Sequence, residues 1–234
     1  MLLSVVIPNY NEENTIERIV HKVIDQKKFI NLEIIVVDDF SLDRSREILK
    51  KLKSTGKIDN LILQNKNYGK GFAIKTALEK CSGDIIIIQD ADLEYDPSDY
   101  KTMLSKMKKD KLKCLYGSRV LGKSRYKQKN FISFFRVLAN HLLTILTNII
   151  YCQKLTDAHT CYKMIDHNLI KKFDLKEKGF AFCPELTAKV SKSKIKIEEC
   201  EISYEGRTYK EGKKINIFDG FQAIWVLIKY RFYD

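Results

Sequence analysis

The sequence has few of the features that mark a secreted or membrane-spanning protein. Its six cysteines form no C-x-x-C pair, its four histidines show no metal-ligand spacing, and no apolar run approaches the ~18 residues of a membrane span. The opening stretch MLLSVVIP lacks the basic leader and cleavage site of a signal peptide. We therefore expect reduced thiols, no zinc site, and a cytoplasmic chain that contacts the cytoplasmic face of a membrane.

Two common catalytic motifs are also missing. The segment NKNYGKGFAIKTAL lacks the G-x-x-x-x-G-K-[ST] pattern of a phosphate-binding loop, and Ser118 has no nucleophile-elbow context. The glycines of that segment indicate close packing at a helix entry, from which Lys70 can reach a diphosphate. Covalent catalysis is therefore not expected.

Positive charge and apolar residues are plentiful. The chain carries 42 Lys and Arg against 30 Asp and Glu, a net charge of +12, which indicates an anionic partner such as a nucleotide, a phosphorylated substrate, a nucleic acid or an anionic membrane. Its 234 residues, 44% of them hydrophobic, can bury one core. We predict a single domain over residues 1–234.

The first half alternates short β-branched runs with amphipathic stretches, the pattern of βαβ units. We predict strands in LSVVIP, LEIIVVDD, NLILQ, DIIIIQD and KCLYGSR, and helices in EENTIERIVHKVID and in SLDRSREILKKL, the latter with Ser41 as its N-cap. The strands carry almost no polar alternation, which suits a parallel sheet covered on both faces. The sequence therefore predicts an α/β fold with a Rossmann-like, mostly parallel sheet that binds ligands at its carboxyl edge.

Beyond Arg119 the pattern changes. A basic stretch, LGKSRYKQKN, precedes a long predicted helix, FISFFRVLANHLLTILTNIIY, which begins with Phe131, Phe134 and Phe135. A short mixed region, a strand in KIKIEECEISY, a polar loop and a closing amphipathic helix, FDGFQAIWVLIKYRF, follow. Aromatic residues beside basic ones are typical of a helix at a membrane interface, and a core helix or a dimer face is the alternative.

Four carboxylates crowd the end of the fourth predicted strand, in QDADLEYDP. Residues i and i+2 of an extended chain point the same way, so Asp90 and Asp92 can share Mg²⁺ or Mn²⁺. The alternative for a D-x-D pattern is a solvated turn, but the buried strand before it favours the metal. Glu94 and Asp96 are predicted to be loop and helix-capping residues, because Asp96 precedes Pro97.

Other polar residues are predicted at the same edge. Asp38 and Asp39 end the second strand, where a carboxylate can accept hydrogen bonds from a ribose or a base, with helix capping as the alternative. Arg119 ends the fifth strand and adds a cation. The tract RTYKEGKK, which contains Arg207 and Lys213, either folds over a phosphate or forms a solvated face.

Taken together, the motifs resemble the inverting glycosyltransferases of family 2, and most of all the branch of dolichol-phosphate mannose synthases and other polyprenyl-phosphate sugar synthases. The segments that carry the resemblance are VVIPNYNEENTI, VVDDFS, NYGKGFAIKTAL, QDADLEYDP, YGSR, TDAHTCYKM, GFAFCPELTAKV and YEGRTYKEGKKI. The resemblance implies a GT-A fold with a nucleotide-sugar-binding half (1–120) and an acceptor-binding half (121–234) that carries interfacial helices.

The resemblance and the residue patterns together assign roles to individual residues. Contacts to the nucleotide sugar are expected from Pro8, Tyr10, Glu12, Asp39, Lys70, Gln89 and Asp90. The metal is expected on Asp90 and Asp92, and phosphate contacts from Arg119, Arg125, Arg207 and Lys213. The catalytic set is Asp90, Asp92, Arg119 and Asp157. Relatives commonly carry an acid where His159 and Cys183 stand, so substrate choice is expected to differ.

The expected reaction is metal-dependent transfer of a hexose, with inversion, from GDP-mannose or a UDP-sugar to a polyprenyl or dolichyl phosphate. A divalent cation on Asp90 and Asp92 neutralises charge on the departing diphosphate. A phosphate acceptor, with a second pKa near ~6, is largely dianionic at neutral pH and needs no strong base. A hydroxyl acceptor needs a base, for which Asp157 is the first candidate.

Two alternatives stay open. One is a family 2 transferase that glycosylates a saccharide hydroxyl in cell-surface polysaccharide synthesis. The other is a non-enzymatic basic module that binds RNA or an anionic membrane. The expected partners are a nucleotide sugar, a polyprenyl phosphate and a membrane surface, and nucleic acid is not expected.

Overall fold

A mixed seven-stranded sheet forms the centre of the molecule. The computed structural model describes residues 1–122, 131–207 and 217–233, without the side chains of residues 131–136 and 217. The strand order is β3-β2-β1-β4-β6-β5-β7. The strands are β1 (Leu3–Asn9), β2 (Leu32–Asp38), β3 (Asn60–Leu63), β4 (Ile85–Ile88), β5 (Cys114–Ser118), β6 (Lys163–Asp166) and β7 (Glu198–Glu201).

The sheet is parallel except for β6. β1 lies between β2 and β4 and is parallel to both, with Leu3 opposite Leu32 on one side and Ile85 on the other. β6 is inserted antiparallel between β4 and β5, and β7 is parallel to β5. The predicted mostly parallel α/β sheet is therefore confirmed. The strand β6 was not predicted, because it has only four residues, of which the first and last, Lys163 and Asp166, are charged.

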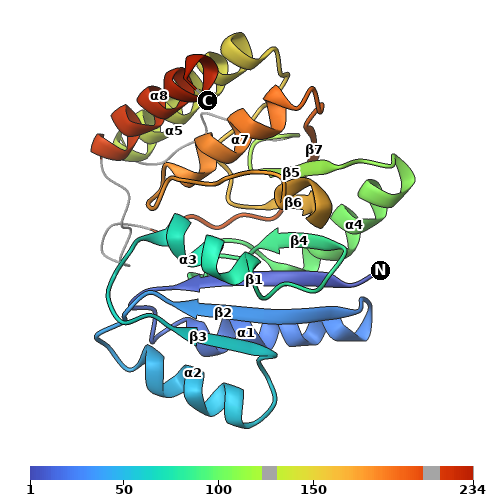
Figure 1. The fold of residues 1–234 in the computed structure, drawn as a ribbon, viewed down its shortest axis with the longest axis vertical. Helices are drawn as coiled ribbons and strands as arrows, with labels where there is room; N and C mark the ends of the chain where they lie inside the picture. Colours follow the sequence, from blue (N-terminus) through green and yellow to red (C-terminus); the bar gives the residue numbers. More distant parts are fainter. Residues whose placement is uncertain (123–130, 208–216, 234) are drawn as a thin grey trace.

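Helices cover both faces of the sheet (Figure 1). They are α1 (Ile16–Asp25), α2 (Ser45–Ser54), α3 (Lys70–Leu78), α4 (Tyr100–Lys109), α5 (Phe131–Tyr151), α6 (His167–Ile170), α7 (Phe182–Lys192) and α8 (Ile217–Phe232), with 3-10 turns at Gln26–Lys28 and Pro97–Asp99. All four isoleucines of β4 are buried because both faces of the sheet are covered. Ile85 and Ile87 belong to the core on the side of α1 and α4, whereas Ile86 and Ile88 belong to the core on the side of α3 and α7. Alternate side chains of a strand thus enter two different cores.

The C-terminal helices form a further layer. α5 and α8 pack on the outer side of α7 (Figure 1), where Tyr151, Ala188, Val226, Leu227 and Tyr230 form a small third core. Among the helices that the structure describes, none combines the length and hydropathy of a membrane span.

Two predicted helix starts had different outcomes. Asp96 caps the turn at Pro97–Asp99 as expected, since its carboxylate accepts the N–H of Ser98 (2.9 Å). The predicted N-cap role of Ser41 is wrong, because α2 begins four residues later. The Ser41 hydroxyl instead donates to Asp38 Oδ1 (2.5 Å), which commits the buried Asp38 carboxylate to its own loop.

Candidate active site

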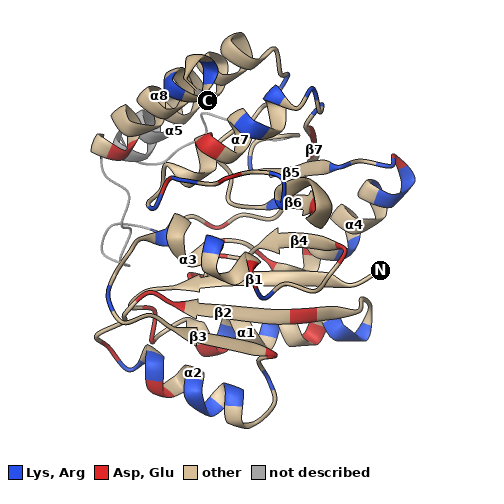
Figure 2. Cartoon of the chain, viewed as in Figure 1, with Lys and Arg blue, Asp and Glu red and all other residues tan. Residues whose placement is uncertain are grey.

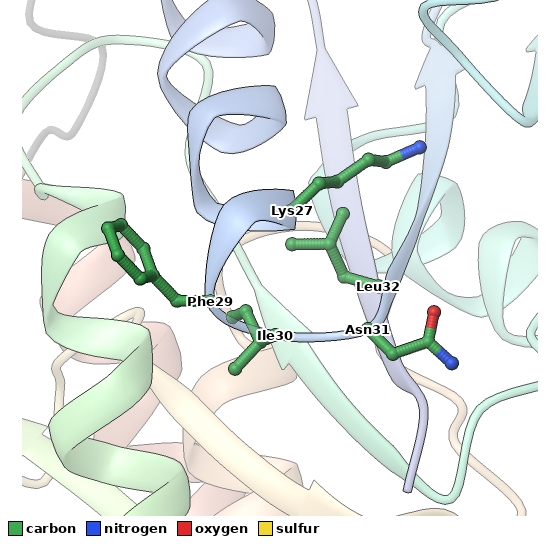
Figure 3. A pocket seen from close by; sticks show the side chains of 5 residues that line it. All are labelled: Lys27, Phe29, Ile30, Asn31 and Leu32. Atoms are coloured by element: carbon green, nitrogen blue, oxygen red, sulfur yellow. The ribbon is translucent and has the colours of Figure 1, made fainter.

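Polar residues gather where β1, β2, β4 and β5 end, as the sequence predicted. Pro8 lies near the end of β1, and Tyr10 follows this strand directly; both are partly exposed. Basic residues elsewhere are spread over α2, α4, α7 and α8 (Figure 2). A surface pocket at the start of β2, lined by Lys27, Phe29, Ile30, Asn31 and Leu32 (Figure 3), lies at the opposite end of that strand and is not part of this site.

Asp39 closes the loop that leads into α3. Its two carboxylate oxygens accept the N–H groups of Tyr68 (2.8 Å) and Gly69 (2.7 Å). Gly69 has a φ of 96°, and a Cβ there would lie 2.6 Å from the carbonyl oxygen of Lys178, so only glycine fits. Burial raises the pKa of Asp39 despite these two donors. Asp39 therefore fixes the turn at Tyr68 and Gly69, directly before Lys70, the first residue of α3.

Lys70 reaches across to the first aspartate of the D-x-D motif. Its ammonium donates to Asp90 Oδ1 (2.5 Å) and lies 3.2 Å from Cys161 Sγ. Burial acts to raise the pKa of Asp90, but the charge and hydrogen bond of Lys70, together with Cys161 and Arg207, lower the pKa overall. Asp90 is therefore an ionised carboxylate, and Lys70, predicted to contact a diphosphate, is next to the predicted metal ligand.

Asp92 has a different environment. Its Oδ2 accepts from Arg207 Nη2 (2.9 Å), and its Oδ1 accepts the N–H of Glu94 (3.1 Å). Burial and the nearby charges of Asp90 and Glu94 raise the pKa of Asp92 to about 7, although Arg207 acts in the opposite direction. Crowded carboxylates of this kind are relieved by a bound cation.

Gln89 is a buried residue that supports the backbone of the D-x-D loop. Its Oε1 accepts hydrogen bonds from the hydroxyls of Tyr100 and Tyr162 (2.6 Å each), and its Nε2 donates to the carbonyl of Asp90 (3.0 Å). The side chain is fully buried. The structure thus places Gln89 beneath Asp90, with protein partners for both its oxygen and its nitrogen, and its predicted contact with the nucleotide sugar stays a prediction.

Glu12 and Arg207 form one unit. The Arg207 guanidinium donates to both Glu12 oxygens (2.9 and 3.2 Å) while it also contacts Asp92. Sequence reasoning placed Glu12 at the nucleoside and Arg207 at a phosphate, and the structure brings the two into direct contact. Arg125 and Lys213, the other predicted phosphate contacts, lie outside the described residues.

Arg119 and Asp157 form a buried ion pair at the same edge of the sheet. The Arg119 guanidinium donates to both oxygens of Asp157 (2.7 and 2.8 Å), and its backbone N–H donates to the same carboxylate (3.2 Å). Burial acts to raise the pKa of Asp157, but the charge of Arg119 and its hydrogen bonds together lower the pKa overall. The bidentate geometry fixes both side chains.

Sequence reasoning missed two residues that organise the site. Glu94 was predicted to be an ordinary loop residue, yet it is 9% exposed and accepts from the hydroxyl of Tyr204 (2.9 Å). The available signal was its position two residues beyond Asp92. Tyr204 had a weaker signal, since it precedes Arg207 by three residues in a polar loop.

The donor set at Asp90 and Asp92 suits a hard divalent cation. Among the described residues, no group of three His, Cys, Asp or Glu side chains is arranged to hold a metal. Two carboxylates are nevertheless what Mg²⁺ commonly takes from a protein when substrate phosphates and water complete its coordination. Asp90 and Asp92 therefore fit such a cation, with Lys70 and Arg207 as the cations that now neutralise them.

The strand order and the flanking helices define a GT-A-like fold. The structure is similar to that of glucosyl-3-phosphoglycerate synthase from Mycobacterium tuberculosis, with a TM-score of 0.74 at 16% identity over 99% of this chain and 79% of that one. It is also similar to TarS from S. aureus, with a TM-score of 0.61 at 18% identity over 98% of this chain and 67% of that one. At these identities the likeness establishes the fold, and it confirms the GT-A prediction.

The family follows from the sequence match. The model of glycosyl transferase family 2 matches residues 4–173, so the chain belongs to this family, and the predicted enzyme class, glycosyltransferase, is confirmed. The chain is 25% identical to the dolichol-phosphate mannosyltransferase of Pyrococcus furiosus, over 98% of this chain and 64% of that protein. It is 26% identical to a dolichyl-phosphate beta-glucosyltransferase of Trichomonas vaginalis, over 92% and 68%. The chain thus spans about two thirds of the length of these relatives.

Proposed function

We propose that the chain transfers a hexose, with inversion, from a nucleotide sugar such as GDP-mannose or a UDP-sugar to a polyprenyl or dolichyl phosphate, with Mg²⁺ or Mn²⁺. Support comes from similar proteins named for transfer to dolichol or dolichyl phosphate. A third, from Pseudomonas fluorescens, is named an undecaprenyl-phosphate 4-deoxy-4-formamido-L-arabinose transferase and is 33% identical over 46% of this chain and 32% of that protein.

The ion pair between Arg119 and Asp157 is the observation that favours a phosphate acceptor over a hydroxyl acceptor. A hydroxyl acceptor needs a general base whose pKa lies near the working pH. Asp157, the candidate base, is held by Arg119 on both oxygens and has a lowered pKa, so it is a weak base. A phosphate acceptor is already anionic and requires a cation instead. Arg119 supplies one at the same edge of the sheet.

The other charged residues take complementary roles in this proposal. A divalent cation on Asp90 and Asp92 supplies Lewis-acid stabilisation of the departing nucleotide diphosphate. Lys70 holds Asp90 in its ionised form, and Arg207 supplies a guanidinium beside Asp92 that can bind phosphoryl oxygens. Asp39 holds the turn at Tyr68 and Gly69, next to the expected nucleoside position.

An exposed apolar face on α8 supports the membrane contact that we propose, which the prediction from the sequence places at the cytoplasmic face. Phe218, Phe221, Trp225 and Phe232 are 76%, 66%, 59% and 73% exposed along one side of this helix. The opposite side of α8 packs into the third core. Aromatic residues with Lys229 and Arg231 in the same helix are typical of interfacial helices. The aromatic side chains predicted for this role at Phe131, Phe134 and Phe135 lie outside the described side chains.

The test is an incubation of the protein with Mg²⁺, a polyprenyl phosphate and a panel of radiolabelled GDP- and UDP-sugars. Label in the organic phase with one of these donors is expected, and EDTA should remove it. Label that appears only on a soluble saccharide would favour the hydroxyl-acceptor alternative. Salt-sensitive RNA binding without any sugar transfer would favour the non-enzymatic module.

A further inference from the structure

Glu94 joins the D-x-D loop to a distant segment of the chain. Its Oε1 accepts the backbone N–H of Arg207 (2.7 Å), its Oε2 accepts the hydroxyl of Tyr204 (2.9 Å), and its carbonyl oxygen accepts the N–H of Glu205 (2.9 Å). Residues 204–207 lie beyond β7, outside any helix or strand. The position of this segment therefore depends on contacts such as these.

The same carboxylate also affects Arg119. The ring of Tyr204 packs against Tyr95 with a centroid separation of 5.2 Å, and the Arg119 guanidinium lies over the Tyr204 ring at 5.2 Å. Glu94 therefore holds the Arg207 backbone directly, whereas Arg119, which is paired with Asp157, contacts Glu94 only through the Tyr204 ring.

We propose that Glu94 is a positioning residue that sets the place of Arg207, and supports Arg119 through Tyr204, in the binding site for the anionic acceptor. The effect that we expect on transfer to the acceptor rests on the proposed function, whereas the effect on the position of residues 204–207 does not. Both oxygens of Glu94 already accept from the 204–207 segment, which assigns Glu94 to this link rather than to the cation. Burying a carboxylate is costly, and two strong donors compensate for the cost only while the segment stays in place.

The structural arm of the test measures hydrogen exchange at the Arg207 amide. Glu94→Ala removes the acceptor, so exchange should become faster by about tenfold or more, the equivalent of one charge-assisted hydrogen bond. Glu94→Gln keeps one acceptor oxygen and should lie between Glu94→Ala and the wild type. Glu205→Ala, which changes an exposed side chain in the same segment, is the matched control and should leave the rate unchanged. Equal exchange in Glu94→Ala and the wild type would overturn the inference.

The kinetic arm measures transfer to polyprenyl phosphate in detergent micelles. Glu94→Ala should raise the KM for the lipid phosphate about tenfold or more, whereas Glu205→Ala should leave it unchanged. Arg207→Ala should add little on the Glu94→Ala background, because the guanidinium is already misplaced. Full additivity, or a loss confined to kcat, would contradict the positioning role. If the wild type transfers no sugar to lipid phosphate, the proposed function fails, and the exchange measurement still decides the link.

Discussion

The two halves of the chain meet at the D-x-D motif, and each half supplies the cation for one aspartate. Asp90 is neutralised by Lys70, 20 residues away in the first half (1–120). Asp92 is contacted by Arg207, 115 residues away in the second half. The pKa of Asp90 is lowered, whereas that of Asp92 is raised to about 7. The main cation of Asp90 thus comes from the first half, whereas the cation of Asp92 depends on how the second half is placed.

Removing the second aspartate should have the largest effect. Asp92→Ala deletes a proposed cation ligand, and the loss of several kcal/mol of charge stabilisation should lower kcat about 10³-fold or more. The melting temperature should not fall, since a crowded carboxylate with a raised pKa is removed. Transfer assays and calorimetry measure the two effects. A fully active variant would remove Asp92 from the cation site.

Asp157→Asn tests the ion pair that joins Arg119 of the first half to Asp157 of the second half. The amide cannot match the charge of Arg119, and breaking a buried pair of this kind costs about 3 kcal/mol of unfolding free energy. Transfer should fall through a higher KM for the acceptor, and the acidic limb of the pH–rate profile should keep its position. Loss of that limb in the variant would instead identify Asp157 as a general base. Denaturant unfolding and pH-dependent kinetics provide the measurements.

The raised pKa of Asp92 predicts how cation binding responds to pH. A protonated carboxylate is a poor ligand, so Mn²⁺ affinity should be highest above pH 7 and should fall by up to about tenfold per unit below it. The shift in melting temperature with Mn²⁺ and a nucleotide diphosphate, at pH 6 and pH 8, measures this dependence. Asp92→Asn is the control and should show no such dependence. Equal affinity in the wild type at both pH values would contradict the assignment.

The smallest expected effect concerns the exposed face of α8. Trp225 is the single tryptophan of the chain, so its emission reports on this helix alone. Anionic vesicles should shift that emission to the blue, and Phe221→Ala should weaken vesicle binding by about tenfold or less, the cost of one interfacial aromatic side chain. Phe29→Ala, which removes an exposed aromatic residue elsewhere on the surface, is the control. An unchanged emission spectrum would indicate that another partner covers α8.

The sequence predicted the first half better than the second for a physical reason. Buried parallel strands read as β-branched runs, and their carboxyl ends locate Asp39, Asp90 and Arg119 without any long-range information. The partners of these residues were not predictable in the same way. Which side chain neutralises Asp92 depends on how residues 204–207 fold back, and the burial of Gln89 depends on two tyrosines from separate elements.

The reversed direction of β6 has a consequence for how the site is assembled. Residues that follow β2, β4 and β5 reach the active-site edge because these strands run toward it. β6 runs away from that edge, so the residues that come before it arrive there instead, and Asp157 and Cys161 are among them. If β6 ran parallel to its neighbours, this loop would enter from the far side of the sheet, and Arg119 would have no carboxylate to pair with. The direction of one four-residue strand therefore decides whether Arg119 has a carboxylate partner in this site.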